Sequence, residues 1–181
     1  VTSPRVPSDA EPAALALQVA ATRMPDRELC AADIASAIPA ASVSAKVRLL
    51  NVLGAVGGQK ALDAISSAMQ QESDELQDVG SRLLGVWMSP DAAPILLRQA
   101  KSTSATKYKI RALRGYIRIA RQFQMPIAER ADMCRNAMLI AKRLDEQRLV
   151  LAILERYPDI EMLKIAASAT RTPGVKQDAE K

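Results

Sequence analysis

Five basic side chains recur at helical spacing in the second half of the chain, separated by 4, 3, 4 and 3 residues. This spacing puts them on one face of a single helix. A row of cations attracts anions, so the chemistry it predicts is salt-dependent binding of a polyanion or of an acidic partner. A solvated outer face of an amphipathic helix is the alternative, and the sequence leaves both readings open. We call this set the basic row; it consists of Lys107, Arg111, Arg114, Arg118 and Arg121.

The charge of the chain is concentrated around the basic row. Residues 101–150 carry 12 Lys or Arg against four Asp or Glu, whereas residues 1–100 carry eight against 11. The net charge of the whole chain is +5. A basic segment of this kind is compatible with nucleic acid. Aromatic residues, which stack on bases, make up only 3% of the chain, so nucleic acid is the less favoured partner.

The residue types exclude most catalytic and metal chemistry. The chain has no histidine, which is the commonest general base and metal ligand. Its two cysteines lie 104 positions apart and have no metal-ligand spacing. Cys134 falls on an apolar helical stripe and Cys30 lies beside Leu29, so both are interpreted as buried thiols. Whether they pair in a disulfide stays open.

Carboxylates gather at two places, but neither resembles a catalytic pair. Glycosidase chemistry needs two carboxylates facing each other across a cleft. These carboxylates are expected at helix starts and on the surface, and no glycine-rich phosphate loop or nucleophile elbow accompanies them. We therefore predict no catalytic, cofactor-binding or metal-binding residue, and no enzyme activity in this chain. The carboxylates in question are Glu72, Asp74, Glu75, Asp78, Asp145 and Glu146.

The elements that position the basic row are all expected to be helices. Alternating strand patterns are absent, and proline, glycine and capping residues divide the chain into apolar helical segments. Asp26 and Asp145 are expected to cap helices, and Gly57 and Gly58 to end one. The expected helices cover 13–23, 26–38, 43–56, 59–70, 74–88, a segment starting at 90, 105–123, 126–143, 145–156 and 160–170.

A repeat is visible in these segments. Four times an apolar helix with a central basic residue is followed by a second apolar helix, and Gly54, Gly85 and Gly115 recur at spacings of 31 and 30. Short loops favour antiparallel neighbours. The pattern predicts an all-α fold, an α-solenoid of about five antiparallel helix pairs. It would form one domain over residues 13–170, with a flexible leader at 1–12 and a flexible tail at 171–181.

The units resemble HEAT-type repeats over roughly residues 26–170. The likeness rests on the paired-helix spacing and on central arginines. Of these we expect Arg48, Arg82 and Arg148 to contact loop carbonyls or acidic groups of the next unit, with ligand contact as the alternative. The segments 108–122, 129–134 and 150–154 are also similar to helical-repeat segments of large bacterial envelope proteins. There, such segments flank β-sandwich domains of the 3-keto-disaccharide hydrolase or glucanase-like type. The central arginines are Arg48, Arg82, Arg111 and Arg148.

These observations favour a binding function. We expect a non-catalytic interaction or scaffolding module, part of a larger multidomain protein, that contacts a protein partner or the neighbouring domains of that parent. The alternative is a HEAT-like protein that binds nucleic acid through the basic row. No apolar run approaches the roughly 18 residues that span a membrane, so no membrane insertion is expected. The resemblance favours an exported, cell-envelope location over a cytoplasmic one, without deciding between them.

Overall fold

The computed structural model describes residues 7–171 and 174–180, and within these residues all regular structure is helical. The all-α prediction is therefore confirmed. The chain divides into two compact units, Val1–Asp91 and Ala92–Lys181, which are described separately. The prediction of one domain over 13–170 stays a prediction.

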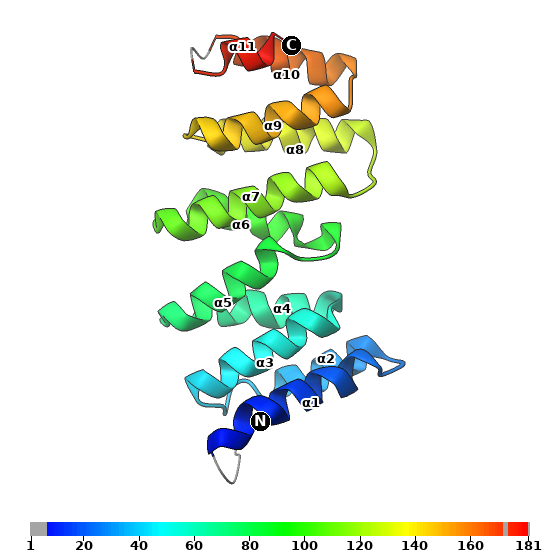
Figure 1. The fold of residues 1–181 in the computed structure, drawn as a ribbon, viewed down its shortest axis with the longest axis vertical. Coiled ribbons are helices and arrows are strands. Elements are labelled where there is room, and N and C mark those ends of the chain that lie inside the picture. Colours follow the sequence, from blue (N-terminus) through cyan, green and yellow to red (C-terminus); the bar gives the residue numbers. More distant parts are fainter. Residues whose placement is uncertain (1–6, 172–173, 181) are drawn as a thin grey trace. The chain divides into compact units, whose positions relative to one another are not determined.

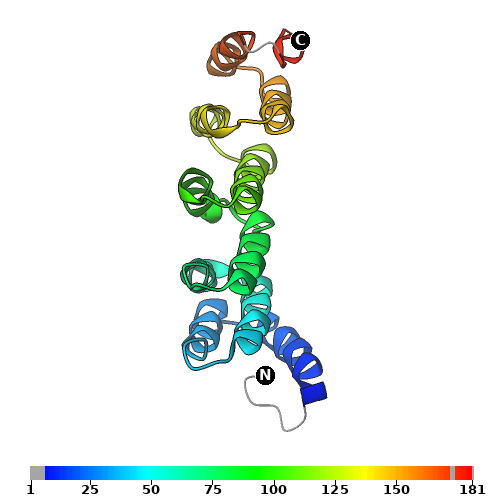
Figure 2. The same ribbon diagram turned by 90° about the vertical axis from the view of Figure 1, so that its left-hand side faces the viewer.

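The described part of unit 1 begins with the 3-10 helix η1 and has five α-helices, which are labelled α1 to α5 in Figure 1. Each α-helix packs against the next one and against the next but one, so that α3 contacts α1, α2, α4 and α5. In Figure 2 the odd-numbered helices of this unit lie on one side and the even-numbered helices on the other. The helices are η1 (Pro7–Asp9), α1 (Ala10–Thr22), α2 (Arg27–Ser36), α3 (Val43–Val56), α4 (Gly58–Ala68) and α5 (Asp74–Gly85).

Unit 2 repeats the same pattern of contacts. Here too each helix packs against the next and the next but one, as α9 does against α7, α8, α10 and α11. The 3-10 helix η2 (Pro90–Ala92) spans the point where the chain passes from one unit to the other. The helices are α6 (Ala93–Ser102), α7 (Thr106–Gln122), α8 (Ile127–Ile140), α9 (Leu144–Arg156), α10 (Ile160–Ala169) and α11 (Lys176–Ala179).

The two ends of the chain differ from expectation where they are described. Residues 1–6 of the expected leader lie outside the described residues, but α1 begins at Ala10, three residues before the expected start. In the expected tail, residues 172–173 and 181 are also outside the description. Val175 is buried there, and α11 packs against α9 and α10. One buried valine is a weak signal in a polar segment, which explains why the sequence does not predict this helix.

Several helix boundaries follow the predicted local chemistry. The Asp26 side chain accepts a hydrogen bond from the Leu29 amide at 2.9 Å, which confirms the predicted cap of α2. Gly57 has φ +74° and ends α3, as expected for a residue in the left-handed region. The prediction that Asp145 caps a helix is wrong. Helix α9 begins one residue earlier, and Arg143 occupies the capping position without a side-chain cap.

Helix α4 is capped by a side chain from another helix. Glu28 of α2 accepts hydrogen bonds from the backbone amides of Gln59 and Lys60, at 2.6 and 2.9 Å. These amides have no acceptor within their own helix, and a carboxylate also complements the positive end of the helix dipole. Gly58 permits this approach, because a Cβ at this position would lie 2.5 Å from the Glu28 Oε1 atom. Its φ of +85° also favours glycine.

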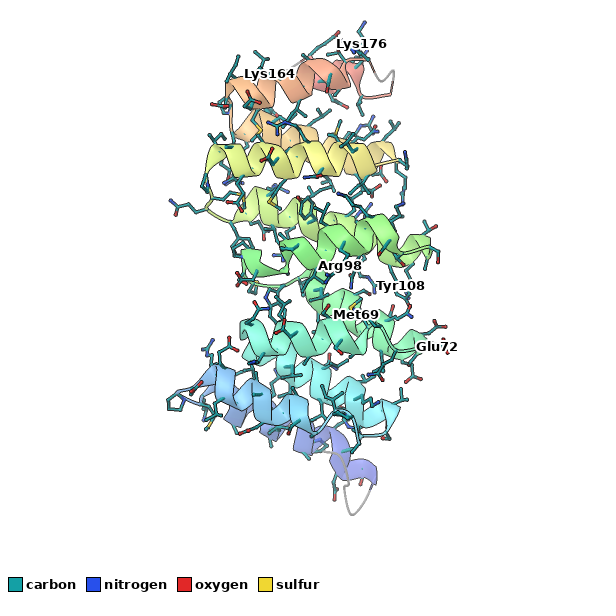
Figure 3. The ribbon with its side chains drawn as sticks, turned by 180° about the vertical axis from the view of Figure 1, so that it is seen from behind. Met69, Glu72, Arg98, Tyr108, Lys164 and Lys176 are labelled. Carbon is teal, nitrogen blue, oxygen red and sulfur yellow. The ribbon has the colours of Figure 1, made fainter. Side chains whose placement is uncertain are left out.

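Small residues allow close contacts within unit 1. A Cβ on Gly54 would lie 2.6 Å from the Leu83 Cδ2 atom, so α3 and α5 approach closely there, as predicted for this glycine. Gly80 does the same for Met69, which is labelled in Figure 3. The corresponding prediction for Gly85 and Gly115 stays a prediction.

Ion pairs join helices that are two apart in the chain. Arg48 of α3 lies 3.8 Å from the Glu11 carboxylate of α1, and Arg148 of α9 lies 3.1 Å from the Asp178 carboxylate of α11. These two central arginines meet acidic groups of other helices, as the repeat pattern predicts. Arg82 differs, because it lies 3.2 Å from the Asp78 carboxylate of its own helix, α5.

Helices α8 and α10 are joined by a small exposed charge cluster. Glu161 receives Lys164 at 2.7 Å and Arg135 at 2.9 Å. The hydrogen bond and the positive charge of Lys164 lower the pKa of Glu161 most, and those of Arg135 lower it further. The cluster is solvent-exposed, so it fixes the relative position of the side chains more than it stabilises the fold.

We expect Glu28→Gln to lower the free energy of unfolding by about 1 kcal/mol. The amide keeps one acceptor oxygen but loses the charge that complements the start of α4. Urea unfolding followed by circular dichroism measures the effect. The matched control is Glu72→Gln, an exposed carboxylate of the same unit, whose change should stay within about 0.5 kcal/mol. Equal effects of the two substitutions would contradict the proposed cap.

Candidate interaction surface

All five residues of the basic row lie in α7, the longest helix of unit 2. Lys107, Arg114 and Arg121 are exposed, whereas Arg111 and Arg118 are half-buried. The opposite stripe faces the core: Leu113, Ile117 and Ala120 are at most 3% exposed, and Ile110 at its start is half-buried. The helical spacing of the five cations therefore places them on the side of α7 that points away from the core.

The two ends of the row are bordered by aromatic rings. The Lys107 ammonium lies 5.4 Å and the Arg111 guanidinium 6.0 Å from the centre of the Tyr108 ring. Arg118 lies 5.9 Å from the centre of the Phe123 ring and donates a hydrogen bond to Gln122 at 2.9 Å. Cation–π contacts of this kind contribute about 0.5–1 kcal/mol at exposed sites. Burial lowers the pKa of Arg118, but an arginine remains charged at neutral pH.

The centre of the row is neutralised from within the fold. The Arg114 Nε and Nη2 atoms each lie 2.8 Å from the Glu146 Oε1 atom, at the start of α9. The Glu146 side chain is only 2% exposed. Arg143 approaches its other oxygen at 3.7 Å, and Asp145 lies 3.9 Å from Arg114. The sequence places Glu146 on the surface, and that interpretation is wrong.

This arrangement changes what the basic row can bind. A buried carboxylate needs a cation nearby, because its desolvation is otherwise uncompensated. Arg114 therefore has a structural task in joining α7 to α9, although about half of its side chain is exposed. The cations that remain for binding lie on either side of Arg114. They are Lys107 and Arg111 toward the start of α7, and Arg118 and Arg121 toward its end.

A second buried charge, Arg130, holds the end of α7 in place, and no local pattern in the sequence points to it. Arg130 of α8 is 4% exposed and donates hydrogen bonds to the backbone carbonyls of Ala120 and Phe123, the latter at 3.0 Å. Its guanidinium lies 3.8 Å from the centre of the Tyr157 ring. The Tyr157 hydroxyl in turn donates to the Arg121 carbonyl at 3.1 Å. A cation at the C-terminus of a helix complements its dipole.

The two thiols are free, and they differ in accessibility. Cys134 is 1% exposed, and burial raises the pKa of its thiol to about 12. Cys30 is half-buried on α2, in the other unit. The predicted burial is therefore confirmed for Cys134 and only partly for Cys30. Within the described ranges, no group of three or more Cys, Asp or Glu side chains is arranged to hold a metal ion.

The remaining carboxylates singled out in the sequence are divided between the two units. Glu72, Asp74 and Glu75 are exposed at the start of α5, as predicted, and they lie in unit 1. Asp145 is exposed at the start of α9 in unit 2, beside the buried Glu146. Across residues 7–171 and 174–180, no helix combines the length and the apolar character that crossing a bilayer requires.

Comparisons of this chain with family models, with curated proteins and with solved structures gave no match. The likeness to HEAT-type repeats and to envelope proteins therefore stays a prediction from the sequence.

We expect Arg114→Met to lower the free energy of unfolding by about 2 kcal/mol, because it leaves Glu146 buried with only the more distant Arg143 nearby. The matched control is Arg121→Met, an exposed member of the same helix and row, which should change stability by less than about 0.5 kcal/mol. Chemical denaturation of both variants measures the difference. If the two cost the same, Arg114 has no structural task.

One thiol per chain should react with a disulfide reagent in the native protein at pH 8, and both should react after denaturation. The Cys134 thiol is covered and stays protonated, because its pKa of about 12 lies far above this pH. The Cys30→Ser variant should show no fast reaction. A fast-reacting thiol in that variant would mean that Cys134 is accessible.

Proposed function

We propose that this chain is a non-catalytic protein-interaction or scaffolding module built from stacked antiparallel helix pairs, an α-solenoid. The observation that carries the proposal is the contact pattern, which is the same in both units: each helix packs against the next and against the next but one. In a solenoid every helix has such neighbours, since each repeat buries its apolar face on the adjoining repeats. Proteins of this architecture commonly bind partners along extended surfaces.

The surface that we propose for binding is the basic row of α7. Its helix is fixed at both sides by buried charges, through Glu146 near its middle and Arg130 at its end. The exposed cations are therefore presented from a rigid support, which lowers the entropy lost on binding. We infer an acidic segment of a protein partner, or of a neighbouring domain of a larger parent protein, as the ligand. The resemblance to envelope proteins supports the second source and an exported location.

Binding of nucleic acid through the same row is the second candidate, favoured by the concentration of positive charge in residues 101–150. The aromatic residues speak against it. All five lie in the described part of the chain; Trp87 and Tyr116 are buried, and the other three are half-buried beside cations. None presents an open ring on which a base could stack. Phosphate contacts alone would give binding without sequence preference.

We expect a fluorescent peptide rich in Glu and Asp to bind the protein at low salt, and to bind at least about threefold more weakly to the double variant Lys107→Ala plus Arg121→Ala. Both positions are exposed, and Arg114 is kept so that the fold is retained. The matched control is Arg27→Ala plus Arg82→Ala, which removes two exposed cations of unit 1. Fluorescence anisotropy measures all affinities.

Labelled duplex and single-stranded DNA are titrated in parallel at low and moderate salt. DNA that binds more tightly than the acidic peptide, with a steep salt dependence and loss in the Lys107–Arg121 double variant, would replace the proposal by the nucleic-acid alternative. Absence of binding to both probes at low salt would contradict the basic row as a binding surface.

A further inference from the structure

An apolar groove lies in unit 2 between α9, α10 and α11, on residues that neither the basic row nor its supports use. Its volume is about 520 Å³, within the range of ligand-binding clefts. The apolar lining comes mainly from Leu151 and Leu154 of α9 and from Ile160, Met162 and Leu163 of α10. Helices α10 and α11 are seen from behind in Figure 3, where Lys164 and Lys176 mark them.

Helix α10 is apolar on two sides, and only one of them is covered. Met162 and Ile165 are at most 5% exposed and face the core. Ile160 and Leu163 are 62% and 63% exposed and lie on the groove. The polar residues of α10, Glu161, Lys164 and Ser168, share one stripe, and Ile160 and Leu163 lie outside it. An apolar side exposed in this way is typical of an interaction surface.

The shape of the groove suits a helix. Pro158 lies in the turn after α9, and Leu151 and Leu154 of this helix follow each other at a spacing of three residues along one side. Ile160, Leu163 and Ala166 do so with a spacing of three along the other. Two such ridges leave a channel between them, into which the apolar side of an amphipathic helix can pack.

The charges at the rim decide which helix fits. Four of the residues that line the groove are acidic and none is basic. Asp178 is paired with Arg148, and Glu180 lies 3.8 Å from Lys176. Glu155 is exposed and has no ion-pair partner among the described residues, and the Asp159 carboxylate accepts a hydrogen bond from the Glu161 amide as the cap of α10. The rim thus keeps a negative potential toward whatever enters.

From this geometry we infer that the groove between α9, α10 and α11 is a second docking site, which takes an amphipathic helix of a partner protein that is basic beside its apolar stripe. The site is independent of the proposed function of the basic row, because its residues and the sign of its charge are different. A module with one basic and one acidic docking surface would hold two partners of opposite charge.

The probe is a synthetic helical peptide of about 18 residues, with Leu along one stripe and Lys on both flanks. Two further peptides keep the leucines and replace every Lys by Gln or by Glu. We expect the basic peptide to bind with micromolar affinity, about tenfold more tightly than the neutral one. The acidic peptide is titrated against the Lys107→Ala plus Arg121→Ala variant, in which the basic row is weakened, and it should bind there most weakly of the three. Fluorescence anisotropy with the full chain measures the three affinities.

Two substitutions locate the binding. Leu163→Asp should lower the affinity for the basic peptide by at least about tenfold. The matched control is Leu15→Asp, which should leave this affinity unchanged. Leu15 of unit 1 is the same residue type and is 62% exposed, against 63% for Leu163. Glu155→Lys should lower the affinity for the basic peptide and raise the affinity for the acidic one. Because Glu155 is exposed, this variant is expected to fold. Circular dichroism checks the folding of all three variants.

The inference is overturned if the basic peptide fails to bind, or if Leu163→Asp and Leu15→Asp have the same effect. Equal binding of the basic and neutral peptides would show a surface without charge preference, such as one covered by a further helix pair of the same stack. A concentration-dependent dimer that Leu163→Asp abolishes, seen by sedimentation, would show that a second copy of this chain is the occupant.

Discussion

The structure depends on one constraint: no helix of this chain can bury its apolar side against a single neighbour. Within each unit the helices pack against both the next and the next but one, and α3 and α9 each have four such neighbours. Their side chains show the result, since Leu50 and Leu53 of α3 and Ile153 of α9 are fully buried. Helices held in this way stabilise one another, because their isolated apolar surfaces are too small to offset the ordering of the chain.

The same constraint explains why charges are found inside unit 2. The side chains packed between α7, α8 and α9 are not all apolar. Glu146 and Arg130 are buried among them, and each has a polar or aromatic partner there. Glu146 meets Arg114, and Arg130 meets the last carbonyls of α7 and the Tyr157 ring. A buried pair of this kind adds little net stability but is costly when one partner is lost, so it fixes how the helices fit together.

The sequence predicts the helices well, because helix signals are local: apolar periodicity, the Asp26 cap and the Gly57 terminator act over a few residues. It also predicts that the basic row lies on one face of α7. It does not predict that Arg114 is neutralised, since the partner comes from another helix. A signal was nonetheless present: Glu146 precedes Val150 and Ile153 at spacings of four and three, which places this charge on the buried face of α9. The Glu28 cap of α4 has no comparable signal, because it joins segments 31 residues apart.

The central claim, that successive helix pairs stack into a solenoid, is tested most directly by small-angle X-ray scattering of the full chain. A compact globule of 181 residues has a radius of gyration of about 16 Å. The account predicts a radius of at least about 20 Å and a pair-distance distribution with a long tail, as expected for a one-dimensional stack. A radius near 16 Å with a symmetric distribution would show a closed bundle around one core, and would contradict the account.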